Sequence, residues 1–183
     1  MILRPGLARP AIGSGQWLRT SAPAIPTTNA VAALRLGAAG LGTYLCRATI
    51  AAVATGTAQV ILQVDDGTAA NRYLWQAGAA SNITQISRSI ASVASTANGA
   101  ALTVDVPFTV ALAIDGAGRA AASLNGAAVI AITGGPTTGL TTVRFGSGVS
   151  GGAAWGGTID YIKLVANKAL SDAELIALAG TVT

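Results

Sequence analysis

The sequence predicts an all-β fold: a two-sheet antiparallel jelly-roll sandwich with one short capping helix at the C-terminus and an extended arm at the N-terminus. Short apolar runs follow one another from residue 43 onward, and clusters of Gly, Asn and Asp separate them, which predicts strands joined by turns. One well-capped helical segment near the end of the chain predicts a lid on the sandwich. The length of 183 residues suits one domain, here residues 43–183, preceded by the arm.

The arm covers residues 1–42. Four of the six prolines lie within the first 30 residues, and this punctuation predicts an extended chain. The first 50 residues hold five arginines and no acidic residue, a pattern typical of segments that dock on anionic surfaces. Because the arginines are spaced singly, we expect a protein partner rather than nucleic acid or a membrane. The expected docking residues are Arg4, Arg9, Trp17 and Arg19.

The first strands follow the arm directly. Residues 44–53 form an apolar run, and residues 58–64 and 71–76 flank the turn residues Asp65-Asp66-Gly67. Residues 82–93 predict a further strand. The next turn is expected at Asn98-Gly99.

The second half of the chain carries the clearest strand signals. Phe108, Val110, Leu112 and Ile114 alternate, so they share one face of a strand over residues 107–115. Residues 119–132 predict a hairpin with Asn125-Gly126 at its tip. Two last strands are expected at 141–147 and 157–165. The long uncharged run from residue 120 to 143 contains these turn residues, so no membrane span is predicted.

The closing helix has a complete N-terminal signal. Ser171 with Glu174 three residues later forms a capping box, and Leu170 with Leu175 fits a hydrophobic staple. Gly180 is the expected C-terminal stop. A helix this short is not stable alone, so we expect it to pack on a sheet edge or face.

Composition excludes several chemistries. The chain has no His, which excludes a Ser-His-Asp triad and histidine metal sites. Cys46 is the one cysteine, and we expect a small buried apolar side chain there. Glycoside hydrolysis needs paired carboxylates, whereas Glu174 is the only Glu and the capping box already explains it. We therefore expect no enzymatic activity.

Five residues are candidates for binding. Asp65 and Asp66, with Asn71, predict either a weak Ca²⁺ site or a turn held by side-chain hydrogen bonds. Arg72 either contacts an anionic ligand or clamps that turn through an ion pair. Trp155 lies in a Gly-rich loop, where it either stacks on a sugar or packs at the sandwich edge. No resident cofactor is expected beyond the possible Ca²⁺.

Four segments, taken in order, resemble laminin-G-like, concanavalin A-like jelly-roll domains. They are VDDGTAANRYLW (64–75), FTVALAIDGAGRAAASLNG (108–126), TTVRFGSG (141–148) and WGGTIDYIKLVANKALSDAELIAL (155–178). The variant with DDGT followed by NR is similar to domains of tailed-bacteriophage virion proteins. The resemblance covers about residues 43–180 and leaves the arm outside.

The resemblance implies a non-enzymatic structural protein of a bacteriophage virion, a head-decoration or fibre protein. Such a protein would attach by its arm to a capsid or tail protein, lie on the virion surface and form a homo-oligomer, most simply a trimer. No secretory signal is predicted, because the first residues lack a continuous apolar segment. The alternative is a carbohydrate-binding adhesin module that recognises a host-surface glycan, since this fold serves many functions.

Overall fold

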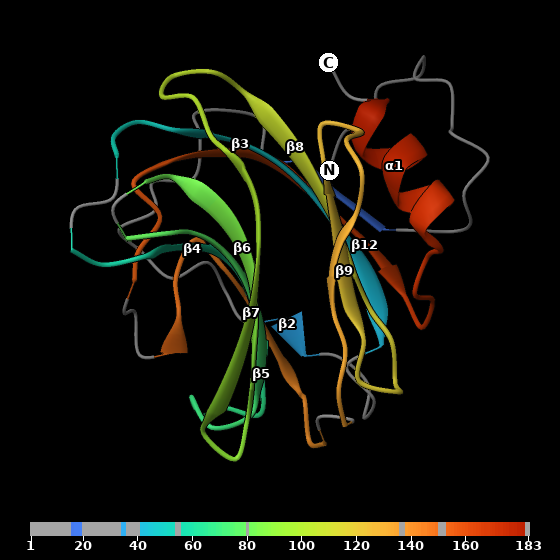
Figure 1. Ribbon diagram of the computed structural model, residues 1–183. Helices are drawn as coiled ribbons and strands as arrows, with labels where there is room; N and C mark the ends of the chain where they lie inside the picture. The colour runs from blue at the N-terminus through green and yellow to red at the C-terminus, as the bar shows by residue number, and fades with distance from the viewer. Residues whose placement is uncertain are drawn as a thin grey trace.

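The computed structural model describes residues 16–19, 34–35, 41–53, 56–79, 81–135, 138–149 and 153–181. These residues fold into two antiparallel six-stranded sheets and one helix. Figure 1 shows three layers, with the helix α1 on the outer side of one sheet and the other sheet beyond it. The predicted two-sheet sandwich with a short C-terminal helix is confirmed.

The first sheet has the strand order β1-β12-β3-β8-β9-β10. Its central strands β3 and β8 pair along their length, and the helix lies over β8 and β9. The bounds are β1 Gln16–Arg19, β12 Gly157–Ala166, β3 Gly42–Ile50, β8 Phe108–Ile114, β9 Ala120–Leu124 and β10 Ile130–Ile132.

The second sheet has the strand order β2-β11-β4-β5-β6-β7. Strands β4, β5, β6 and β7 are consecutive hairpins, so neighbours in the sequence are neighbours in the sheet. The bounds are β2 Leu34–Arg35, β11 Thr142–Phe145, β4 Gln59–Asp65, β5 Arg72–Ala77, β6 Ile83–Ile90 and β7 Val93–Ala101.

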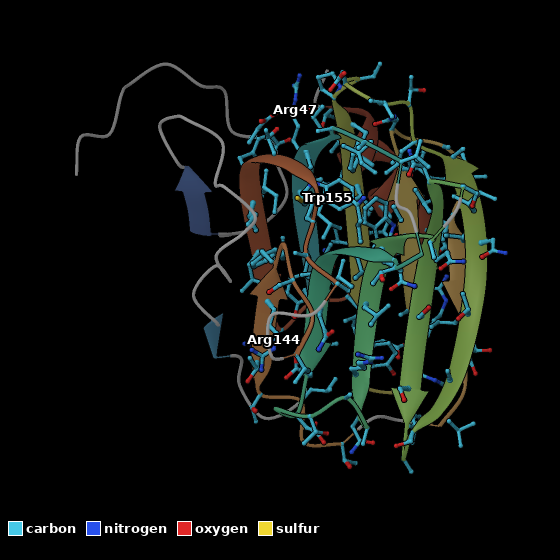
Figure 2. The ribbon with its side chains drawn as sticks, turned by 90° about the vertical axis from the view of Figure 1, so that its left-hand side faces the viewer. Arg47, Arg144 and Trp155 are labelled. Atoms are coloured by element: carbon cyan, nitrogen blue, oxygen red, sulfur yellow. The ribbon has the colours of Figure 1, made fainter. Side chains whose placement is uncertain are left out.

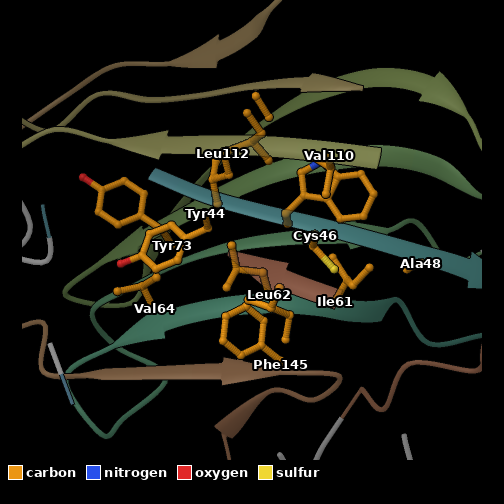
Figure 3. Packing of buried hydrophobic residues seen from close by; sticks show 14 of the residues in the cluster. Tyr44, Cys46, Ala48, Ile61, Leu62, Val64, Tyr73, Val110, Leu112 and Phe145 are labelled. Atoms are coloured by element: carbon orange, nitrogen blue, oxygen red, sulfur yellow. The ribbon is translucent and has the colours of Figure 1, made fainter. Parts of the chain in front are cut away.

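The main core lies between the two sheets. Alternate residues of each central strand point into it, as strand geometry requires. Figure 3 shows Cys46, Val110 and Leu112 from the first sheet facing Leu62, Val64 and Phe145 from the second. Cys46 is 1% exposed, as expected for a small apolar side chain, and its burial raises the pKa of the thiol.

Strand β8 is buried on both faces, and this explains the helix. Phe108, Val110, Leu112 and Ile114 enter the main core on the predicted face. The opposite face carries Ala111 and Ala113, whose small side chains let α1 (Asp172–Gly180) approach closely. This second, smaller core contains Leu45, Ala111, Ala113, Ala121, Leu170, Leu175, Leu178 and Ala179.

The helix begins as predicted and ends differently. The Ser171 hydroxyl accepts from the Glu174 backbone N–H, and the Glu174 carboxylate accepts from the Ser171 N–H at 2.8 Å. Leu170 and Leu175 are both buried in the second core, as the staple requires. Gly180 is the last helical residue rather than a left-handed stop. The C-cap is Thr181, whose hydroxyl donates to the Leu178 carbonyl at 2.9 Å.

One predicted turn is wrong. Asn98 and Gly99 lie inside β7, and the β6–β7 turn is formed by Ala91 and Ser92, with φ of 48° and 69°. Both residues adopt the left-handed region that two-residue hairpin turns need, although neither is Gly or Asn. The Asn71 side chain accepts from the Ala91 N–H at 3.0 Å, so a neighbouring turn stabilises this conformation. The hairpin at Asn125-Gly126 is confirmed, with φ of 51° and 75°.

The predicted arm lies mostly outside the described residues. Besides Leu41 and Gly42, the latter the first residue of β3, its described pieces are β1, which pairs with β12, and β2, which pairs with β11. Each adds an edge strand to one sheet. Arg4 and Arg9 lie outside the described residues, and Trp17 and Arg19 occupy positions on β1. The docking role of these four residues stays a prediction.

Candidate functional site

The second sheet has an outward surface that we call the polar face. Tyr73 and Trp75 of β5 point into the core. The residues that alternate with them, Arg72, Leu74 and Gln76, therefore point outward. No helix of the described chain covers this side, in contrast to the first sheet. Figure 2 looks onto it. The polar face comprises Thr142, Arg144, Gln63, Asp65, Arg72, Leu74, Gln76, Gln85, Ser87, Ser89, Thr96 and Asn98.

A buried ion pair fixes one side of the polar face. Arg144 donates to both carboxylate oxygens of Asp65, from Nε at 2.8 Å and from Nη2 at 3.3 Å. Gln63 Nε2 and the Gly67 N–H donate to the same carboxylate, each at 2.8 Å. Asp65 is 0% exposed, so these donors replace water around its charge. This carboxylate is therefore a structural anchor and not a metal ligand.

Asp66 holds the adjacent turn. It accepts from the Thr68 N–H at 2.8 Å, from the Thr68 hydroxyl and from Asn71 Nδ2 at 2.8 Å. The hydrogen bond from the Thr68 side chain is the main reason that the pKa of Asp66 is lowered. In the described part of the chain, no three His, Cys, Asp or Glu side chains gather to hold a metal ion. The residues fit the turn interpretation and do not fit a Ca²⁺ site.

Arg72 is placed differently from the predicted clamp. It lies opposite Asp65 in the register of β4 and β5, yet the ion pair of Asp65 is made by Arg144. Within the described residues, the side chain of Arg72 makes no hydrogen bond or ion pair. It lines a shallow depression of about 120 Å³, together with Leu74, Gln76, Ser87, Arg88, Ser89 and Ala94. The structure thus places a half-buried guanidinium, with no partner among the described residues, beside a hollow in the polar face.

Amide side chains continue the polar face across three strands. Gln76 Nε2 donates to Gln85 Oε1 at 2.9 Å, and Gln85 Nε2 donates to Asn98 Oδ1 at 3.0 Å. We call these three residues the amide ladder. One row away, the hydroxyls of Ser87 and Thr96 are 2.9 Å apart. Each amide keeps unused donors and acceptors after these bonds, so the ladder can bind further hydroxyl groups in a fixed arrangement.

Trp155 packs against other residues, as one of its two alternatives predicted, but it does so in the main core and not at the sandwich edge. It is 1% exposed, its ring meets Phe108 edge-on at 5.8 Å, and its Nε1–H donates to the Thr49 carbonyl at 3.1 Å. Figure 2 shows Arg144 toward one end of the molecule and Trp155 toward the other. Stacking of a sugar on Trp155 is therefore wrong, because the ring has no exposed face.

Sequence reasoning selected Arg72 and Asn71 but missed Arg144 and the amide ladder. Alternation in residues 72–76 and 85–89 carried a usable signal, because it puts polar residues on one face of each strand. Arg144 gave no local signal, since its partner Asp65 is 79 residues away in the sequence.

Among the described residues, no helix is long and apolar enough to cross a membrane.

Several solved structures share this fold. The CBM40 of the Ruminococcus gnavus IT-sialidase, bound to α2,3-sialyllactose, has a TM-score of 0.65 and 19% identity over 89% of this chain and 98% of that chain. Domain 4 of AbnA, a GH43 extracellular arabinanase from Geobacillus stearothermophilus, in complex with arabinotriose, has a TM-score of 0.66 and 13% identity over 91% and 82%. The leech intramolecular trans-sialidase has a TM-score of 0.67 and 20% identity over 94% of this chain and 29% of that chain.

These likenesses show a jelly-roll β-sandwich. No protein-family model matches the sequence, and no curated protein matches it. Two of the three structures are separate modules or domains of glycan-processing enzymes, and none of the three is a virion protein.

Proposed function

We propose that this protein is a non-catalytic glycan-binding module whose ligand lies on the polar face. The observation that carries the proposal is a sheet surface that no helix of the described chain covers, on which the amide ladder is already hydrogen-bonded in place beside Arg72, whose side chain has no partner among the described residues. The fold supports it, because similar sandwiches have been solved with sialyllactose and arabinotriose bound.

Sugar hydroxyls both donate and accept, and the ladder offers both functions. Gln85 uses one N–H and one lone-pair direction within the ladder, which leaves one N–H and further acceptor capacity for a ligand. No aromatic side chain belongs to the polar face, so hydrogen bonds rather than ring stacking supply the binding energy. We expect a dissociation constant on the order of 1 mM for one oligosaccharide, equivalent to about −4 kcal/mol.

Charge sets the preferred ligand. In one row of the sheet, Thr142, Asp65 and Arg72 are register partners, and Arg35 of β2 is the partner of Thr142. Asp65 is already neutralised by Arg144, so Arg72 leaves an excess of positive charge. A glycan with a carboxylate or sulfate group suits this row better than a neutral one, because charge-assisted hydrogen bonds are the stronger kind.

Titration calorimetry with 3′-sialyllactose, lactose and arabinotriose tests the proposal. Arg72→Ala should weaken 3′-sialyllactose about tenfold, since one hydrogen bond to a charged group contributes about 1.5 kcal/mol, and should leave lactose nearly unchanged. Gln85→Ala should weaken all ligands. Arg119→Ala is the matched control, because Arg119 lies just before β9 of the other sheet and is paired with Asp172. Equal affinities in the Arg72 and Arg119 variants would contradict the assignment, and binding to no glycan on a broad array would remove the function.

The virion setting stays a prediction that rests on the sequence resemblance. Docking through residues 1–42 on a capsid or tail protein, a place on the virion surface and a trimeric homo-oligomer belong to it. Light scattering on the full chain and on a variant without residues 1–42 tests the homo-oligomer and the part of the arm in forming it. An oligomer that becomes monomeric on deletion supports an assembly arm, whereas a monomer in both forms opposes it.

A further inference from the structure

A second, larger pocket lies on the opposite side of the sandwich, where the helix ends. Its volume is about 360 Å³, within the range of small-molecule sites. It is lined by Arg47, Pro107, Phe108, Thr109, Asn125, Ala179 and Gly180. We propose that this pocket binds a small carboxylate with an apolar body, a site separate from the polar face and independent of the glycan proposal.

The pocket forms where the outer surface of the first sheet changes character. Under α1 this surface consists of Leu45, Ala111, Ala113 and Ala121. At the end of the helix, the next row across the sheet is polar: Tyr161, Arg47, Thr109 and Asn125 are register neighbours on β12, β3, β8 and the β9 turn. The helix cannot cover this row, because it stops at Gly180.

Two side chains of this row keep donors available. Arg47 reaches Asp160 only through Nε at 3.6 Å, the longest ion pair of the described chain, so its two terminal nitrogens have no described partner. Asn125 Oδ1 accepts from the Thr109 N–H at 2.7 Å, which fixes the amide and leaves Nδ2 without a partner among the described residues. A planar guanidinium beside an amide N–H₂ matches the two oxygens of a carboxylate.

The remaining polar groups of the row are already occupied. Thr109 and Tyr161 each have a further interaction partner, and burial raises the pKa of Tyr161 to about 12, so its hydroxyl stays neutral. The apolar part of the lining comes from Pro107, Ala179 and the Cα of Gly180. A ligand thus meets its charge partner on the sheet and an apolar surface around it.

The test follows the side-chain amide signal of Asn125 in ¹H–¹⁵N spectra of the full chain during titration with phenylacetate at constant ionic strength. We expect saturable movement, with acetate binding more weakly because it lacks the apolar body. Arg47→Met should raise the dissociation constant about tenfold, the loss of one charge-assisted hydrogen bond. Arg119→Met should change nothing, because its guanidinium already pairs with Asp172 away from the pocket.

A second variant guards against misfolding. Asn125→Asp keeps the acceptor for the Thr109 N–H and tolerates the left-handed backbone at φ 51°, but replaces the donor with a negative charge. It should retain the thermal midpoint and lose phenylacetate binding, read from the backbone signal of Thr109. No saturable shift, equal affinity for acetate and phenylacetate, or unchanged binding in either variant would overturn the proposal. Arg72→Ala should leave phenylacetate binding intact, so the two sites succeed or fail separately.

Discussion

The outer surfaces of the two sheets differ in what lies on them: a helix covers part of the first, and no helix of the described chain covers the second. On the first sheet, Ala111, Ala113 and Ala121 form a smooth apolar surface that α1 covers with Leu175 and Leu178. On the second sheet, the equivalent surface is the polar face, with its ion pair and amide ladder. One surface gains stability from an added layer, whereas the other pairs many of its polar groups within the sheet. A surface organised in the second way can hold a ligand without losing a structural contact.

The largest effect is expected where the polar face is also structural. Asp65→Ala should destabilise the protein by about 3–5 kcal/mol, because it leaves the Arg144 charge and the Gln63 amide without their buried partner. Asp172→Ala, which removes an exposed ion pair with Arg119, should cost less than about 1 kcal/mol. Urea unfolding of both variants checks the contrast. Similar losses would mean that the Asp65 pair is not the anchor of this face.

The second largest loss of stability is expected from truncating a helix side chain that packs on the covered surface of the first sheet. Leu175→Ala removes a side chain that is 0% exposed and should cost about 3 kcal/mol. Ile176→Ala is the neighbouring control, since Ile176 is 37% exposed and should lose under about 1 kcal/mol. If both variants unfold at the same urea concentration, the helix does not stabilise the first sheet through this core.

A smaller effect belongs to the helix cap and depends on pH. Hydrogen bonds from the Ser171 backbone and the Lys168 side chain lower the pKa of Glu174 from 4.5 to about 2. The ionised form stabilises the fold, so this contribution is complete above pH 4.5 and is lost as the pH falls toward 2. Glu174→Gln keeps an acceptor without the charge. The stability difference between the two proteins should therefore shrink over that window, and a constant difference would contradict the assignment.

Local signals predicted much of this architecture. The Asn125-Gly126 hairpin and the Ser171–Glu174 capping box succeeded because the residues that decide them are near in sequence. The turn at Ala91-Ser92 was missed because Asn71, 20 residues away, stabilises it. Such contacts depend on how separate strands come together.

The candidate site shows the same limit. Arg72 was selected because it follows the Asp65-Asp66 turn in the sequence. The ion pair with Asp65 that was predicted for it is made by Arg144, which lies far away in the sequence on β11. The amide ladder needs the register of β5, β6 and β7, which a sequence pattern does not give. Trp155 could be placed in the core only once the neighbouring Phe108 and the Thr49 carbonyl were located.

Substitutions on the polar face should have the smallest effect on stability, and they test most directly how this face differs from the surface that the helix covers. Arg72→Ala and Gln85→Ala alter the polar face at half-buried positions, so each should change the unfolding free energy by under about 0.5 kcal/mol. The same variants should lose glycan affinity, so binding and stability separate on this face. On the covered surface no such separation is possible, because every outward side chain there packs against the helix. A large stability loss in Arg72→Ala would show that its guanidinium has a structural partner and would move the ligand site elsewhere.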